Sequence, residues 1–223
     1  AEFYVGTDGG VFRFKGVAAF YQGDSATAME AFEAGYKLAR HHNDPYQTCV
    51  ACNNLGIWYQ HQKQYPKALE YHGRSLALAH ELNDAQRQAK THSNLGLIFM
   101  EQGDFPKATE AFTLSLDLAR AHHLMRDESI ALGNLGWALL NQGRLDEALI
   151  HLTQKLELAT KMIDKQEIGK ALGNISTVYL AQEQYDKALE ILNELLTLNQ
   201  ELGDEEEIHG VKELIAEIQQ AMD

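Results

Sequence analysis

The chain has 223 residues, of which 45% are hydrophobic and 23% are charged, and its formal net charge at neutral pH is −13. This acidity opposes binding to nucleic acid or to an anionic membrane surface, because both draw affinity from clustered Lys and Arg. No stretch is long and apolar enough to span a bilayer. We therefore expect a folded, soluble, helix-rich protein with neither nucleic acid nor membrane as a partner.

A motif recurs along the chain at a fixed interval of 40 residues. Residues 1–10 show weak helical patterning and end in Gly9-Gly10, so we expect a lead-in segment and a first helix that begins near Val11. The recurring copies are Asn54-Leu55-Gly56, Asn94-Leu95-Gly96, Asn134-Leu135-Gly136 and Asn174-Ile175-Ser176. A constant period in this size range predicts a repeat array in which each unit packs on its neighbours.

Each period has the pattern of a helix, a short turn, a second helix and another turn. In the second period Asp44 is placed to cap a first helix over residues 45–61, and a second helix is expected from Tyr65 to about Leu82. Asp84, Asp164 and Asp204 are the expected caps of later first helices. Gly103 and Gly143 stand where the end of a helix favours a positive φ.

These patterns predict one elongated domain over residues 11–222. Its repeats are expected at about 11–43, 44–83, 84–123, 124–163 and 164–203, followed by a capping helix at 204–222. Every second helix carries an alanine at the same register position, and we expect these alanines to face the glycines of the first helices. The alanines are Ala28, Ala68, Ala108, Ala148 and Ala188.

The repeated residues resemble the tetratricopeptide repeat signature. Leu55-Gly56, Tyr59 and Ala68 match its pattern, as do Leu95-Gly96, Phe99, Ala108 and Phe112 over residues within the 11–222 span. The period of 40 exceeds the usual ~34 residues, as in spindle-orientation adaptors, kinesin light chains and bacterial regulatory proteins of this family. The resemblance implies an all-α, right-handed α-solenoid of about five helical hairpins, whose concave groove holds a peptide or helix of a partner protein.

The resemblance also implies which side chains face that groove. The amides of Asn54, Asn94, Asn134 and Asn174 would form a row that bonds a ligand backbone, since an amide both donates and accepts hydrogen bonds. The alternative is that these amides join neighbouring helices. Ile57, Leu97 and Trp137 lie three residues beyond, on the same helix face, and with Leu140 they would contact apolar ligand side chains. For Ile57 and Leu97 the alternative is an ordinary place in the core.

Two lysines complete the expected peptide-binding set. Lys90 and Lys170 match the lysine that chaperone-binding members of the family use to hold a carboxyl terminus. Those members carry Arg one turn further on, where this chain has Asn94 and Asn174. A chaperone carboxylate clamp is therefore not expected here.

Cys49 and Cys52 form the only C-x-x-C pair, with His41 and His42 upstream. A metal or redox site is the less favoured reading of this pair, because both cysteines fall inside a predicted helix, where small buried thiols are expected. Two cysteines do not make a disulfide framework, and they fit a reducing, cytoplasmic location. No phosphate-binding loop, nucleophile elbow or zinc-protease motif is present, so we expect neither enzymatic activity nor a cofactor.

The sequence thus predicts a protein-interaction module with a protein or peptide ligand. It acts either alone or as the sensing or scaffold domain of a larger regulator. The alternatives are a self-assembling solenoid without a groove ligand, in which the chain forms a homo-oligomer, and the less favoured metal or redox protein.

Overall fold

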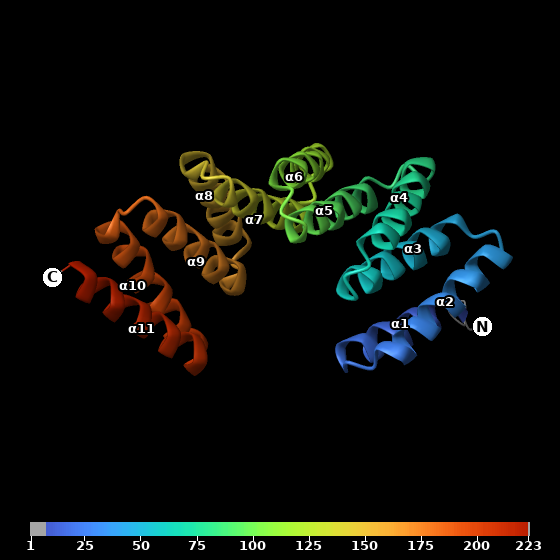
Figure 1. Cartoon of the computed structure of the whole chain (residues 1–223), viewed down its shortest axis with the longest axis horizontal. Coiled ribbons are helices and arrows are strands. Elements are labelled where there is room, and N and C mark those ends of the chain that lie inside the picture. Colours follow the sequence, from blue (N-terminus) through green and yellow to red (C-terminus); the bar gives the residue numbers. More distant parts are fainter. Residues whose placement is uncertain (1–7, 223) are drawn as a thin grey trace. The chain divides into compact units, whose positions relative to one another are not determined.

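The structure, a computed structural model, describes residues 8–222 and is helical throughout this range apart from short turns (Figure 1). The chain divides into two compact units, which meet in sequence between Gln102 and Gly103. The first unit contains five helices: α1 (Asp8–Tyr21), α2 (Ser25–His41), α3 (Pro45–His61), α4 (Tyr65–Glu81) and α5 (Ala85–Glu101).

The second unit contains the other six helices of the described chain. They are α6 (Phe105–Ala121), α7 (Met125–Asn141), α8 (Leu145–Met162), α9 (Lys165–Ala181), α10 (Tyr185–Leu202) and α11 (Glu205–Met222). Within each unit, helices that follow one another pack together: α1 on α2 and α3 on α4 in the first, α7 on α8 and α9 on α10 in the second. The capping helix α11 packs on α10.

The helix boundaries agree closely with the sequence. Helix α3 has the predicted bounds, and α4 ends one residue before Leu82. The first helix, however, begins at Asp8 rather than near Val11, because Gly9 and Gly10 continue the helix instead of breaking it. Residues 1–7 of the predicted lead-in lie outside the described residues. The expectation of one continuous domain stays a prediction.

All ten turns between the helices share one backbone feature. The second residue of each three-residue turn has a positive φ, and this left-handed residue recurs every 20 residues, twice in each sequence period. The next residue donates its backbone N–H to a carbonyl five residues back, as from Asp44 to Ala39 and from Asp84 to Ala79, both at 3.0 Å. The left-handed residues are Gly23, Asn43, Lys63, Asn83, Gly103, His123, Gly143, Ile163, Glu183 and Gly203.

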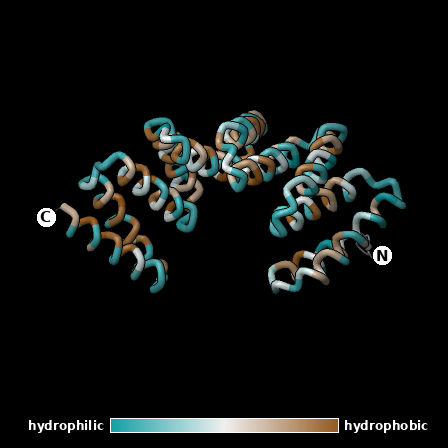
Figure 2. Tube along the Cα trace, in the orientation of Figure 1, coloured by the Kyte–Doolittle hydropathy of each residue, from teal (hydrophilic) through white to brown (hydrophobic). Residues whose placement is uncertain are grey.

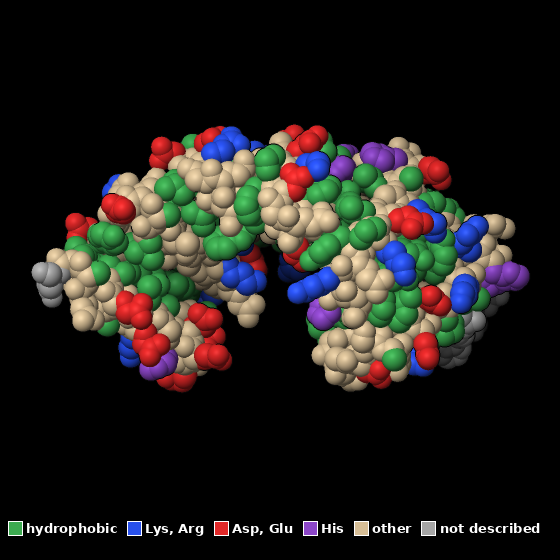
Figure 3. Space-filling view, in the orientation of Figure 1, with side chains coloured by type: hydrophobic (Ala, Val, Ile, Leu, Met, Phe, Trp, Pro, Cys, Tyr) green, Lys and Arg blue, Asp and Glu red, His purple; other side chains and the backbone are tan. Residues whose placement is uncertain are grey.

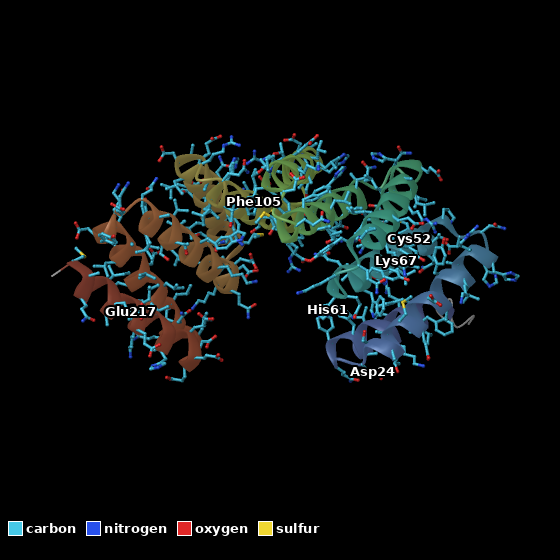
Figure 4. The ribbon with its side chains drawn as sticks, in the orientation of Figure 1. Asp24, Cys52, His61, Lys67, Phe105 and Glu217 are labelled. Atoms are coloured by element: carbon cyan, nitrogen blue, oxygen red, sulfur yellow. The ribbon has the colours of Figure 1, made fainter. Side chains whose placement is uncertain are left out.

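Aspartates cap the helices that follow these turns. The carboxylate of Asp44 accepts a hydrogen bond from the backbone N–H of Gln47 at 2.9 Å, and the predicted caps at Asp84, Asp164 and Asp204 make the equivalent bond. Asp24, in the turn between α1 and α2 (Figure 4), also caps its helix, which the sequence analysis did not predict.

The core follows the repeat, with one correction to the expected packing. All five repeated alanines are fully buried. They are not the nearest neighbours of the first-helix glycines, however. A Cβ added at Gly56 would lie 2.6 Å from the ring of His72, and one at Gly136 would lie 2.6 Å from Leu152. The glycines therefore accommodate the large residue one helical turn after each alanine. Figure 2 shows hydrophobic positions recurring along every helix between hydrophilic ones.

Candidate functional site

The predicted apolar contacts lie at the surface. Ile57, Leu97 and Trp137 are 36%, 37% and 44% exposed, at equivalent positions of α3, α5 and α7. Leu140 is half-buried. Exposed apolar side chains that repeat at one register position are available to a partner, since they contribute little to the core.

The four predicted asparagines are half-buried, and one of them has a partner within the chain. The side-chain amide of Asn94 in α5 donates to the side-chain oxygen of Asn53 in α3 at 2.9 Å. At Asn94 the structure therefore shows the alternative role, a link between the first helices of consecutive repeats. Asn54 lies beside a crevice of only about 10 Å³ between α2 and α3.

A pocket of about 800 Å³ in the second unit brings four predicted residues together. Trp137 and Asn134 reach it from α7, while Lys170 and Asn174 reach it from α9. The others, Ile57, Lys90, Asn94, Leu97 and Leu140, are not among its lining residues. Figure 3 shows hydrophobic side chains gathered over the helices of this unit, with charged side chains around them. This pocket is the candidate binding site.

Glycines create the space. Gly169 and Gly173 stand one turn apart on α9 and put no side chain into the pocket, and Gly133 does the same on α7. A Cβ at Gly133 would lie 3.0 Å from Nζ of Lys155 in α8. The glycine therefore leaves room for the long side chain of this lysine.

Two lysines share one carboxylate inside the pocket. Nζ of the buried Lys155 lies 2.8 Å from one oxygen of Glu167, and Nζ of the exposed Lys170 lies 2.7 Å from the other. Burial opposes ionisation of Glu167, but the hydrogen bonds from Lys155 and Lys170 outweigh it and lower the pKa of the carboxyl group. Glu167 is therefore ionised at neutral pH, and it balances only one of its two cationic neighbours.

Sequence reasoning missed Lys155, Glu167 and Asn199, all of which line the pocket. A signal for two of them was present in the repeat. Lys155 stands at the position of Ser75 and Ser115, and both of these serines are buried. Asn199 stands where the earlier repeats carry a buried alanine, at Ala39, Ala79, Ala119 and Ala159.

The two cysteines lie in the helical core of the first unit (Figure 4). Burial raises the pKa of the Cys52 thiol to about 11 and also raises that of Cys49, whose sulfur lies 3.3 Å from the carbonyl oxygen of Ser75. No cluster of three or more His, Cys, Asp or Glu side chains suited to a metal occurs among residues 8–222. The arrangement is that of buried, protonated thiols.

None of the described helices combines the length and apolar character needed to cross a membrane.

Comparison with protein families agrees with this geometry. Two segments, residues 47–121 and 127–201, match a tetratricopeptide repeat model, and residues 93–157 match a second tetratricopeptide repeat model. The matches cover more than half of the chain, which therefore belongs to the tetratricopeptide repeat family. No curated protein matched the sequence at a significant level.

Solved structures share the fold at low sequence identity. A STAND protein with a tetratricopeptide repeat sensor from Pyrococcus horikoshii is 14% identical with a TM-score of 0.82, over 99% of this chain and 35% of that one. BtubC from P. vanneervenii is 17% identical with a TM-score of 0.76, over 85% of this chain and 78% of that one. A Rap protein in complex with competence and sporulation factor is 16% identical with a TM-score of 0.73, over 93% of this chain and 64% of that one. The predicted all-α tetratricopeptide solenoid is confirmed.

Proposed function

We propose that this chain is a protein-interaction module that binds a peptide or helical segment of a partner protein at the pocket between α7, α8, α9 and α10. The observation that carries the proposal is the exposed Trp137 beside Asn134 and Asn174 at one open pocket. Aromatic side chains are frequent anchors at interfaces, and amides satisfy the backbone of a bound segment.

The family supports the same function. Repeat proteins of this kind stack helices into extended binding surfaces and generally have no catalytic site. Two of the similar structures are described as a sensor and as a complex with a named factor. A sensing or scaffold role within a larger regulator is the corresponding proposal for this chain.

The test is a selection of phage-displayed random dodecapeptides on the whole chain. Selected peptides are then titrated against the intact chain and two variants. Trp137→Ala removes an exposed anchor from the pocket, and Ile150→Ala is its matched control, since Ile150 is also exposed but lies outside the pocket.

We expect enriched peptides whose affinity falls about tenfold or more with Trp137→Ala and is unchanged with Ile150→Ala. Both variants alter surface side chains, so both are expected to fold. A selection that enriches no peptide contradicts the proposed function. Equal affinity for the intact chain and Trp137→Ala places the binding elsewhere and contradicts the proposed site.

A further inference from the structure

The residues that deviate from the repeat pattern gather at this pocket. Lys155 replaces the buried serine of two earlier repeats, and Asn199 replaces the buried alanine of all four. Substituting a lysine or an amide for a small buried residue is unfavourable for folding unless the new polar atoms are satisfied. Two such substitutions at one pocket indicate a role that the packing of the repeat does not require.

The hydrogen-bonding state of Asn199 indicates what that role is. The residue is only 5% exposed, it lines the pocket, and its buried side-chain nitrogen has no hydrogen-bond partner. An amide nitrogen is a donor, so the missing partner is an acceptor oxygen. A buried donor left without an acceptor costs roughly 1–3 kcal/mol, and an incoming oxygen recovers this free energy.

The charges identify the kind of oxygen. Lys155 and Lys170 share the single carboxylate of Glu167, which leaves one positive charge in excess beside the pocket. Lys165, which also lines the pocket, is paired with Glu201 at 2.9 Å. The other two acidic lining residues, Asp204 and Glu207, are exposed, and Asp204 is engaged in capping α11. The buried part of the pocket is therefore cationic, although the chain as a whole carries a net charge of −13.

We propose that the pocket selects partner segments with an internal Asp or Glu, whose side-chain carboxylate accepts a hydrogen bond from Asn199 and pairs with Lys155 and Lys170. This inference rests on the proposed function and specifies its ligand. Exposed Ile130, Trp137 and Leu202 line the same pocket and contact an apolar residue beside the acidic one. The ligand is thus a segment that combines one carboxylate with an apolar neighbour.

The repeat itself supplies the variant that tests this inference. Asn199→Ala introduces the residue present at the equivalent position of four other repeats, so the fold is expected to be retained. Asn193→Ala is the matched control, because Asn193 lies on the same helix, is exposed and lies outside the pocket. Peptides selected on the intact chain are synthesised with each Asp or Glu in turn replaced by Asn or Gln, and affinities are measured by isothermal titration calorimetry.

We expect every enriched peptide to share an acidic position, and its replacement by the amide to weaken binding about tenfold or more, as for a hydrogen bond to a charged group. Asn199→Ala weakens the acidic peptide to a similar extent, whereas Asn193→Ala has no effect. The amide peptide loses little further affinity on Asn199→Ala, because the two changes remove the same interaction. Added salt weakens the acidic peptide more than the amide peptide.

Two results overturn the inference while leaving the proposed function intact. One is enrichment of peptides without a shared acidic position. The other is equal affinity of the acidic peptide for the intact chain and Asn199→Ala. A selection that enriches no peptide at all contradicts the proposed function and this inference together.

Discussion

Replacement of Ile163 by glycine is expected to stabilise the second unit. Ile163 ends α8 in the left-handed conformation, with φ 56° and ψ 33°, and its side chain is 82% exposed. For a residue with a Cβ this conformation costs roughly 1–2 kcal/mol, and a β-branched side chain makes it more crowded. Because the side chain is almost entirely in solvent, little packing offsets this strain.

Part of the gain is lost through the unfolded state. Glycine gives the unfolded chain more freedom, which takes back about 0.4–1 kcal/mol. We therefore expect Ile163→Gly to raise the free energy of unfolding by about 0.5–1 kcal/mol. Ile150→Gly is the matched control, because Ile150 is also exposed but lies inside α8, where glycine destabilises a helix by about 0.5 kcal/mol relative to isoleucine.

The assay is urea unfolding followed by circular dichroism, with the slope of the free energy against urea compared among the three proteins. The same residue type is exchanged in both variants, so the effect on the unfolded chain is similar, and the difference between them reports the native conformation. We expect the two variants to differ by about 1–2 kcal/mol, with opposite signs relative to the parent. If Ile163→Gly destabilises the chain as much as Ile150→Gly does, the left-handed turn residue is not strained.

Three further predictions concern the first unit. Gly56→Ala is expected to destabilise it by about 1–3 kcal/mol in urea unfolding, because the new Cβ would meet the His72 ring, whereas Gly73→Ala, with open space around it, is expected to stabilise α4 by up to about 1 kcal/mol. Burial lowers the pKa of His72 to about 4, so between pH 6.5 and 4 the unfolded chain binds a proton that the folded chain does not; stability should fall with pH across this window by on the order of 3 kcal/mol, and His72→Leu should remove that part of a pH titration of unfolding. Asn94→Ala is expected to cost about 1 kcal/mol by breaking the bond to Asn53, and a double-mutant cycle with Asn53→Ala that shows additive losses would contradict this coupling.

The sequence was sufficient to predict the helical architecture because the repeat fixes it locally. Asp44 and Pro45 begin α3 at the predicted residue, and Gly103 and Gly143 have the predicted positive φ. Capping and turn chemistry depend on a few neighbouring residues, so they can be identified without knowing what packs nearby.

The binding pocket was only half predictable, for a reason that also lies in the repeat. Trp137 and Lys170 were found because they share a register position on the first helices, which the family resemblance places at the groove. Lys155 and Asn199 lie on the second helices, where the same resemblance predicts packing. Their roles depend on Gly133 and on an unpaired amide nitrogen, which only the three-dimensional arrangement shows.

The regular spacing of the left-handed turns limits how such a chain can change in length. A loss of 20 residues would leave every turn geometrically intact, yet all later helices would exchange places, so that surfaces made for solvent would be pressed into the interior. A loss of 40 residues keeps both the turns and the faces in step. Growth and shortening of this protein are therefore expected to proceed by whole hairpins, and a pocket such as the one beside α9 can be gained or lost as a single cassette.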